Sequence, residues 1–150
     1  MENTNPKWRV ALGGDHAAVD LKNEIIVFLK EQGHEVTDYG PNSTDVCDYP
    51  DYAHPVCNAI EEGKHDFGVL ICGSGIGISI AANRHKGIRA ALVWNSELAE
   101  ITRKHNNSNV ICLGARFVAP FHAKKMVETF LNAPFDEGIH VPRLAKLNTF

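Results

Sequence analysis

Apolar runs and amphipathic stretches alternate along the chain. Short apolar runs that end at glycine or polar residues predict five strands, at residues 8–12, 34–39, 67–72, 88–93 and 109–113. After each run, apolar residues recur at helical spacing, which predicts helices at 17–32, 49–63, 76–85, 97–105 and 121–131. A last short helix is expected at 143–147.

The run at residues 67–72 is the strongest of the five strands. Its nearly continuous apolar character is typical of a central parallel strand that is covered on both faces. Five β-then-α units in succession predict an α/β fold, a Rossmann-like three-layer sandwich with a five-stranded parallel sheet. No linker or repeat interrupts the units, so residues 1–150 are expected to form a single domain.

Composition narrows the class of protein. The 150 residues are 44% hydrophobic and 22% charged, as in ordinary globular domains. The net charge of -3 and the lack of a basic run argue against nucleic-acid binding. No stretch approaches the ~20 apolar residues of a membrane span. Residues 1–7 are polar, which predicts no secretory leader, and the four cysteines lack C-x-x-C spacing, so we expect reduced thiols and a cytoplasmic protein.

The turn Cys72-Gly73-Ser74-Gly75-Ile76-Gly77 is the strongest candidate for chemistry. Its glycines allow backbone N–H groups to approach a ligand, and the expected helix start favours an anion or a thiolate at the same place. Cys72 could then take a proton from carbon, with N–H groups stabilising the enediolate. The motif has neither the Gly-Lys-Ser/Thr ending of a P-loop nor dinucleotide spacing. The alternative is a tight turn that begins with a buried cysteine.

Two other strand ends carry polar residues. In parallel sheets, ligands bind at the carboxyl ends of the strands. Asp15 and His16 follow the first strand, and Arg116 follows the fifth. Asp15 could accept hydrogen bonds from sugar hydroxyls or shuttle a proton, but Asp is equally a favoured helix N-cap. His16 could meet a phosphate.

The remaining candidates are weaker when taken singly. His105 could act as an acid or base near neutral pH, or could simply be a histidine at a helix C-terminus. Arginine binds phosphate through two parallel hydrogen bonds, so it is the better candidate among four phosphate ligands: Arg116, Arg143, His140 and Lys146. Metal binding is not expected, because the other histidines lack ligand spacing: His54, His65, His85 and His122.

Five blocks together resemble one family. They are Gly14-Asp15-His16-Ala17, Asp48-Tyr49-Pro50-Asp51-Tyr52, the segment from Ile71 to Asn83, His105-Asn106-Asn107-Ser108-Asn109, and Leu113-Gly114-Ala115-Arg116. In order and spacing they resemble type B ribose-5-phosphate isomerases, which form a wider family with the galactose-6-phosphate isomerase subunits. The resemblance runs from about residue 9 to residue 147. It implies interconversion of ribose 5-phosphate and ribulose 5-phosphate without a metal or organic cofactor.

The resemblance also implies roles for individual residues. Cys72 would be the base, Ser74 would lie beside the enediolate oxygens, and His105 would protonate the furanose oxygen to open the ring. The other expected substrate contacts are the cradle glycines Gly73, Gly75 and Gly77, the sugar ligands Asp15, Tyr49 and Asn106, and the phosphate ligands His16, Arg116 and Arg143. Members are homodimers or homotetramers with shared sites, in which the histidine–asparagine block and the arginine that follows it come from the neighbouring subunit.

The sequence departs from the family pattern at one position. Many members have an arginine directly before the tail histidine, where this chain has Ile139 before His140, although the second arginine is kept as Arg143. Losing one charge-assisted contact weakens phosphate binding by roughly 1.5–3 kcal/mol if nothing replaces it. His140 or Lys146 could compensate, or the preferred substrate could differ. The alternatives are therefore a galactose-6-phosphate or other hexose-phosphate isomerase, and a non-catalytic sugar-phosphate-binding relative.

Overall fold

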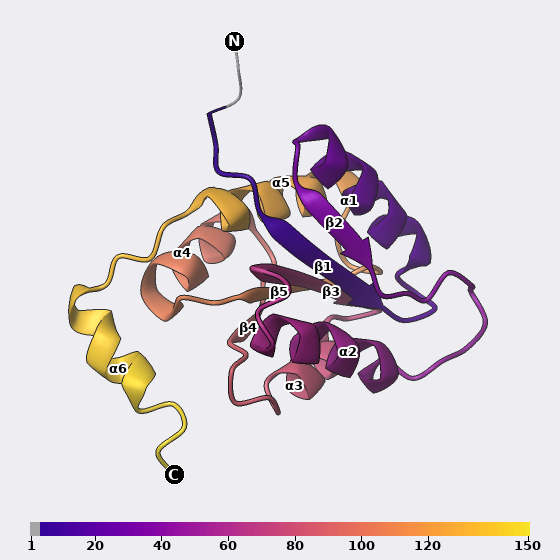
Figure 1. The fold of residues 1–150 in the computed structure, drawn as a ribbon. Helices are drawn as coiled ribbons and strands as arrows, with labels where there is room; N and C mark the ends of the chain where they lie inside the picture. The colour runs from indigo at the N-terminus through magenta and orange to yellow at the C-terminus, as the bar shows by residue number, and fades with distance from the viewer. Residues whose placement is uncertain (1–3) are drawn as a thin grey trace.

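A five-stranded parallel sheet forms the centre of the protein, in the strand order β2-β1-β3-β5-β4 (Figure 1). The computed structural model describes residues 4–150. The strands are β1 (Arg9–Gly14), β2 (Glu35–Asp38), β3 (Phe67–Cys72), β4 (Ala90–Leu92) and β5 (Val110–Gly114). The helices are α1 (Val19–Glu31), α2 (Pro50–Glu61), α3 (Ile76–Ala82), α4 (Ser96–Asn106), α5 (Pro120–Asn132) and α6 (Val141–Ala145). The predicted α/β class with five parallel strands is confirmed.

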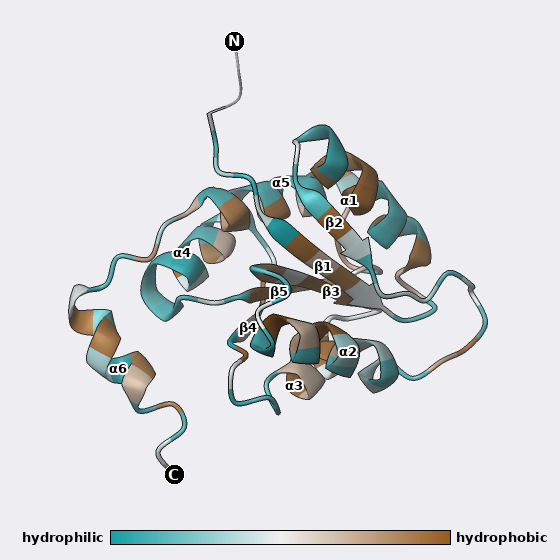
Figure 2. Cartoon of the chain, in the orientation of Figure 1, coloured by the Kyte–Doolittle hydropathy of each residue, from teal (hydrophilic) through white to brown (hydrophobic). Residues whose placement is uncertain are grey.

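Helices cover both faces of the sheet. Helices α1, α4 and α5 pack on one face, and α2 and α3 pack on the other (Figure 1). Side chains alternate along each central strand, so Val69 and Ile71 enter the first core while Leu70 and Cys72 enter the second. Figure 2 shows the resulting apolar bands on the strands and on the helices that cover them. The alternation places Cys72 on the side of α2 and α3.

Strand order fixes where a ligand can bind. The chain moves from β1 to one side to form β2, and then crosses to the other side of β1 to form β3. The carboxyl ends of β1 and β3 therefore flank a switch point, where α/β sheets open a crevice. The register sets Gly14 of β1 beside Ile71 of β3, so the residues that follow, Asp15 and Cys72, lie at that point.

Several element boundaries differ from the sequence-based expectation. Helix α3 ends at Ala82, because the side chain of the next residue, Asn83, binds the backbone of Ala90. Asn83 Nδ2 donates to Ala90 O over 2.9 Å, and Ala90 N–H donates to Asn83 Oδ1 over 2.8 Å. Strand β4, at the edge of the sheet, has three residues and is shorter than the expected strand at 88–93. The last helix begins at Val141, two residues early, because Pro142 is accommodated in its first turn. A 3₁₀ turn, Gly138–His140, precedes it.

The sequence also led us to expect no secretory leader and no membrane span. Residues 1–3, part of the polar segment from which no secretory leader is expected, lie outside the described residues. Over residues 4–150, none of the helices combines the length and the apolar character needed to cross a bilayer.

Candidate active site

Cys72 is the last residue of β3 and only 4% of it is exposed. The backbone N–H of Gly75 donates a hydrogen bond to Cys72 Sγ over 3.2 Å. Gly75 can do this because its φ is +77°, in the left-handed region that favours glycine. A Cβ here would also lie 2.5 Å from Leu92 Cδ1. The geometry of this turn is compatible with the expected anion cradle. Helix α3, which follows it, has only seven residues.

Ser74 and Tyr49 complete the mouth of this turn. Ser74 Oγ accepts a hydrogen bond from Ile76 N–H over 3.2 Å, which leaves the hydroxyl proton available to another partner. The ring of Tyr49 packs directly on Gly77, where an added Cβ would lie 2.9 Å from the phenol oxygen. Glycine at 77 thus lets the Tyr49 hydroxyl reach the start of α3.

Backbone hydrogen bonds draw the neighbouring strand ends onto this turn. Asp15 N–H donates to Ile71 O over 3.2 Å, and Ala115 N–H donates to Cys72 O over 2.8 Å. The guanidinium of Arg116 lies over Gly73, with Nη1 3.3 Å from where a Cβ would be. We call this group the cysteine half: Asp15, His16, Tyr49, residues 72–77 and Arg116.

Asp15 is not the N-cap that the sequence also allowed. Helix α1 has Ala18 at its N-cap, and Asp15 Oδ1 instead accepts from Ala17 N–H over 2.9 Å, closing the turn before the helix. Its side chain is held at the sheet edge, with 7% of the residue exposed. His16 Nδ1 accepts from Cys47 N–H over 3.3 Å, which fixes the ring and leaves Nε2 as the ring nitrogen for a ligand.

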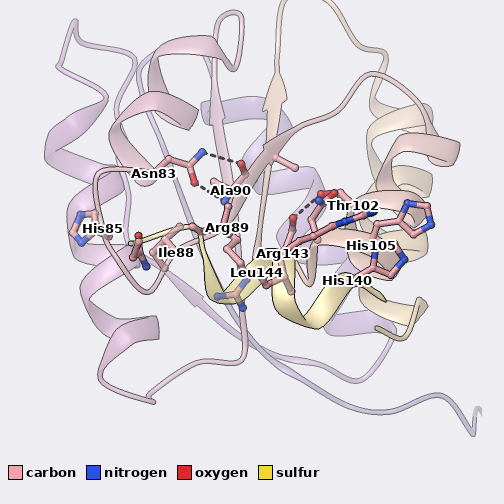
Figure 3. A pocket seen from close by; sticks show the side chains of 15 residues that line it. Asn83, His85, Ile88, Arg89, Ala90, Thr102, His105, His140, Arg143 and Leu144 are labelled. Atoms are coloured by element: carbon pink, nitrogen blue, oxygen red, sulfur yellow. Dashed lines mark hydrogen bonds between the residues drawn. The ribbon is translucent and has the colours of Figure 1, made fainter. Parts of the chain in front are cut away.

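His105 and Asn106 lie elsewhere, at the end of α4 (Figure 3). The His105 ring stacks on the ring of His140, with centroids 4.4 Å apart and planes 16° from parallel. Both rings, Asn106 and Arg143 line a cavity of about 610 Å³ between the end of α4 and the C-terminal segment. We call these four residues the histidine half.

The two halves lie at opposite edges of the sheet. Cys72 pairs with Gly114, the last residue of β5, whereas the turn after His105 leads directly into Val110, the first. Five strand residues span roughly 13 Å, so side chains beyond the two ends are farther apart still. One chain therefore does not bring His105 to Cys72. Arg116, the arginine that follows the His105 block, lies in the cysteine half of its own chain, contrary to the expectation that it accompanies His105.

Two arginines, Arg89 and Arg103, hold the turn that follows His105. Asn107 adopts a left-handed conformation with φ of 46°, and its carbonyl accepts from Arg89 Nε over 2.8 Å. Arg103 Nη1 donates to Asn107 Oδ1 over 2.9 Å and to Ser108 O over 2.6 Å. These contacts position the histidine half, although nothing in the sequence pattern marked either arginine.

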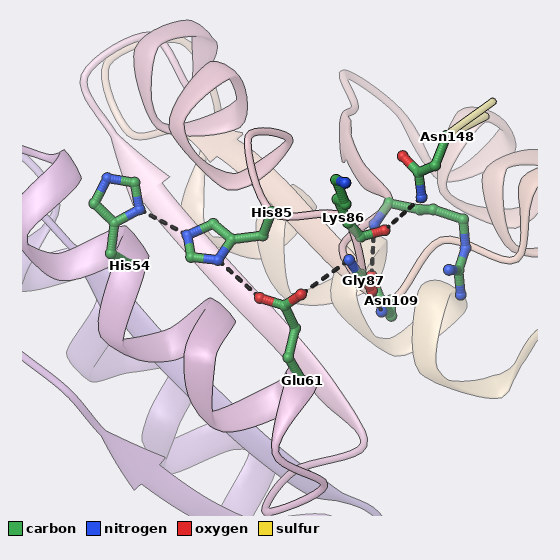
Figure 4. Close-up of polar contacts among 8 residues, drawn as sticks. His54, Glu61, His85, Lys86, Gly87, Asn109 and Asn148 are labelled. Carbon is green, nitrogen blue, oxygen red and sulfur yellow. Dashed lines mark hydrogen bonds and ion pairs between the residues drawn. The ribbon is translucent and has the colours of Figure 1, made fainter. Parts of the chain in front are cut away.

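Sequence reasoning also missed a chain of polar contacts between α2 and the loop after α3 (Figure 4). His54 Nδ1 and His85 Nε2 lie 2.7 Å apart, and His85 Nδ1 lies 2.8 Å from Glu61 Oε1. Glu61 Oε2 accepts from Gly87 N–H over 2.9 Å. The one available signal was the seven-residue spacing of His54 and Glu61, which sets both on one face of a helix.

The other cysteines have different surroundings. Burial and the nearby Glu61 raise the pKa of Cys57 to about 12, and burial raises the pKa of Cys112 well above its ordinary value. These thiols stay protonated and act as packing residues. Cys47 is partly exposed in a loop. Within residues 4–150, no cluster of three or more histidine, cysteine or acidic side chains is placed to hold a metal ion.

Comparisons with known proteins agree over nearly the whole chain. The family described as Ribose/Galactose Isomerase matches residues 10–147. The chain is 43% identical to a D-erythrulose-4-phosphate isomerase from Pectobacterium atrosepticum, covering 94% of this chain and 93% of the relative. It is 43% identical to ribose-5-phosphate isomerase B from Escherichia coli, covering 91% of each.

Solved structures are equally similar. A ribose 5-phosphate isomerase from Thermotoga maritima has a TM-score of 0.92 at 44% identity, covering 94% of this chain and 97% of that one. A ribose-5-phosphate isomerase B from Mycoplasma genitalium with bound ribulose 5-phosphate has a TM-score of 0.88 at 41% identity, covering 92% of each chain.

Proposed function

Because the chain belongs to the ribose/galactose isomerase family, we propose that it interconverts ribose 5-phosphate and ribulose 5-phosphate. This is an intramolecular oxidation–reduction, in which C1 of the sugar is reduced and C2 is oxidised. The electrons stay within the substrate, so the reaction needs no redox cofactor, and the proposed mechanism uses only side chains and backbone N–H groups of the protein. The place of the reaction is the non-oxidative pentose phosphate pathway.

Cys72 is the base of the proposed mechanism. Its thiolate takes the proton from C2 of the open-chain aldose and returns it to C1, while the hydroxyl proton on O2 passes to O1. Charge builds up on the enediolate oxygens between these steps, and N–H groups of the 72–77 turn stabilise it together with the Ser74 hydroxyl. The 3.2 Å contact from Gly75 N–H to Cys72 Sγ is the observation that carries this assignment. Asp15 assists at the neighbouring strand end by binding a sugar hydroxyl.

The remaining steps need the histidine half. His105 protonates the ring oxygen to open the furanose, and Asn106 holds a sugar hydroxyl. Phosphate is bound by His16 and Arg116 at the cysteine edge and by Arg143 at the other. Since these groups occupy opposite edges of one sheet, we propose that the histidine half comes from a second copy of the chain. The protein then works as a homodimer, or as a homotetramer built from such dimers, and we place it in the cytoplasm.

A second substrate is favoured by the relative that is named a D-erythrulose-4-phosphate isomerase. At the position where many family members have a phosphate-binding arginine, this chain has Ile139. The isoleucine is exposed, with 68% of its surface accessible. A four-carbon sugar phosphate carries its phosphate on O4, so it has no free hydroxyl at that carbon with which to close a five-membered ring. Such a substrate would need the proton transfer at Cys72 but not ring opening by His105.

A panel of substrates separates these activities. Ribose 5-phosphate, erythrulose 4-phosphate, galactose 6-phosphate and allose 6-phosphate are each assayed for kcat/KM with the purified protein. The proposal predicts the highest value for ribose 5-phosphate. A clear preference for the four-carbon or a six-carbon substrate would replace it with that activity, and no turnover of any of them would indicate a non-catalytic sugar-phosphate-binding protein.

A further inference from the structure

A second cavity, of about 450 Å³, opens at the amino edge of the sheet. It lies beside the Asn107 turn and shares Arg89 with the cavity of the histidine half (Figure 3). We call it the basic cleft. Three arginines and a histidine line it, Arg9, Arg89, Arg103 and His65, together with Asp66, Asn107 and Asn109. The proposed isomerase mechanism uses none of them.

Of the three arginines in the basic cleft, only Arg9 has an ion-pair partner among residues 4–150. Arg9 is paired with Asp66, with Nη2 2.9 Å from Oδ1. Arg103 is 8% exposed and stacks on Phe67, its guanidinium carbon 4.8 Å from the ring centroid. Burial lowers the pKa of the Arg89 and Arg103 guanidinium groups, and Arg89 lowers the pKa of Arg103 further. Two partly desolvated cations thus lie close enough to repel each other, with no carboxylate partner among residues 4–150, which is a costly arrangement.

Unused hydrogen-bond donors gather in the same cleft. Within residues 4–150, two buried side-chain nitrogens have no hydrogen-bond partner, Arg103 Nε and His65 Nδ1, and both residues line it. His65 Nε2 lies 2.8 Å from Tyr39 OH, so if the phenol donates to it, Nδ1 carries the proton. Arg89 donates through Nε to Asn107 O, and its two terminal nitrogens have no protein acceptor in the described part of the chain. The two buried nitrogens lack an acceptor, and the Arg89 terminal nitrogens can donate to a ligand in the cleft.

We propose that the basic cleft binds a phosphate-type oxyanion between Arg89 and Arg103. Such an ion supplies negative charge where two cations lack it, and it has enough acceptor oxygens for two guanidinium groups and a histidine N–H. A free phosphate ion and the phosphoryl group of an ester share this chemistry. Both arginines also hold the Asn107 turn, so the bound ion contacts the supports of His105 and Asn106 without entering the catalytic centre.

Phosphate-dependent stability tests the site in solution. The variant Arg116→Gln/Arg143→Gln first removes both arginines among the three proposed catalytic phosphate ligands and leaves His16. Its thermal midpoint should still rise saturably with inorganic phosphate or glycerol phosphate, titrated in parallel, but not with acetate at equal ionic strength. The compound with the lower half-saturating concentration identifies free phosphate or an ester as the ligand.

Adding Arg89→Gln should raise that concentration about tenfold or more, because hydrogen bonds between charged partners are the strong ones. The matched control is Arg84→Gln, which removes an exposed arginine outside the cleft and should leave the concentration unchanged. The proposal is wrong if neither compound saturates, or if the two additional substitutions have equal effects.

A crystallographic measurement on the unaltered protein does not depend on the folding of variants. Crystals soaked in tungstate, a tetrahedral dianion with a strong anomalous signal, should show a peak between Arg89 and Arg103. Density at the catalytic phosphate ligands alone would overturn the proposal. The result is independent of the substrate preference, since a chain without isomerase activity would still bind the ion here.

Discussion

The two halves of the proposed active site are built in different ways. In the cysteine half, the backbone sets the geometry: Cys72 is almost fully buried, and Gly75 and Gly77 sit where a Cβ would approach other atoms to 2.5 and 2.6 Å. In the histidine half, exposed side chains meet across a cavity, and one of the two segments is a C-terminal tail. That tail is attached by few contacts, such as the hydrogen bond of 2.8 Å from Asn148 Nδ2 to Lys86 O.

This difference separates the reaction into a fixed part and an adjustable part. Proton transfer between neighbouring carbons is common to every aldose–ketose pair, and the proposed mechanism assigns it to the cysteine half. Sugar size and ring form vary among substrates, and the proposed mechanism assigns ring opening and part of the sugar and phosphate binding to the histidine half and its tail. Ile139, the departure from the family pattern, lies in that tail.

Removing the base should have the largest effect. Cys72→Ala is expected to lower kcat/KM for ribose 5-phosphate about 10²–10⁴-fold, because a positioned base contributes that much. The fold should survive, since alanine fits the buried position and loses only the sulfur. Cys112→Ala is the matched control, because Cys112 points into the same core but lies within its strand. Activity of Cys72→Ala at the level of this control would show that another group moves the proton.

Removing the ring-opening acid should affect substrates unequally. His105→Asn is expected to lower kcat/KM for ribose 5-phosphate about 10²-fold, at the lower end for acid–base groups. Turnover of erythrulose 4-phosphate, which cannot close a furanose ring, should fall far less. Steady-state kinetics on both substrates measures the ratio. Equal losses would mean that His105 acts in binding or proton transfer and not in ring opening.

Filling the glycine cradle tests how rigid the cysteine half is. Gly75→Ala forces a side chain into the left-handed region, at about 1–2 kcal/mol, and against Leu92 and Leu113, at about 1–3 kcal/mol more. Gly63→Ala is the control, since Gly63 has φ of 79° with no atom within 4 Å of its Cβ position. Urea unfolding of both variants measures the difference. An equal loss of unfolding free energy in the two variants would show that the turn can accommodate a Cβ at position 75 without a steric clash.

The smallest effect is expected from an ion pair at the amino edge. The hydrogen bond from Arg9 lowers the pKa of Asp66, against the opposing effect of burial. A carboxyl with a lowered pKa stabilises the fold above its ordinary pKa of about 3.9, and loses that contribution as the pH falls through the folded-state value.

Asp66→Asn should therefore lower the urea midpoint slightly at pH 7 and converge with the unaltered protein in acid. The effect is small because the two side chains are 44% and 30% exposed. Glu62→Gln breaks a more exposed pair with Lys64 and should change the midpoint less. A difference for Asp66→Asn that persists at all pH values would exclude the ion pair as its cause.

Local sequence pattern was enough to predict the sheet and to place Asp15, Cys72 and Arg116 at its carboxyl edge, whereas Tyr49 was expected only from the resemblance. Apolar runs defined the strands, and parallel order placed their carboxyl ends together, so Asp15, Cys72 and Arg116 could be expected at one edge. Boundaries set by single side chains could not be predicted in this way. Asn83 ends α3 through bonds to Ala90, seven residues on, and no periodicity encodes that contact.

Residue type alone marked His105, His140 and Arg143 as weak candidates, but only the resemblance predicted that His105 and Asn106 act in one site with Cys72. The stacking of His105 on His140 joins residues 35 positions apart through the path of the tail. The His54–His85–Glu61 contacts and the arginines behind Asn107 are likewise tertiary. Whether two chains complete one site is a property of the assembly, which the pattern of one chain does not contain.

Mixing two inactive variants tests that central claim most directly. Cys72→Ala and His105→Asn subunits are unfolded together in equal amounts, refolded and assayed with ribose 5-phosphate. If each site takes its cysteine half from one chain and its histidine half from another, half of the random pairs contain one intact site, and about one quarter of the wild-type activity returns. If both halves of a site came from the same chain, every site would carry a defect. Activity that stays at the level of the separate variants would therefore contradict the shared site.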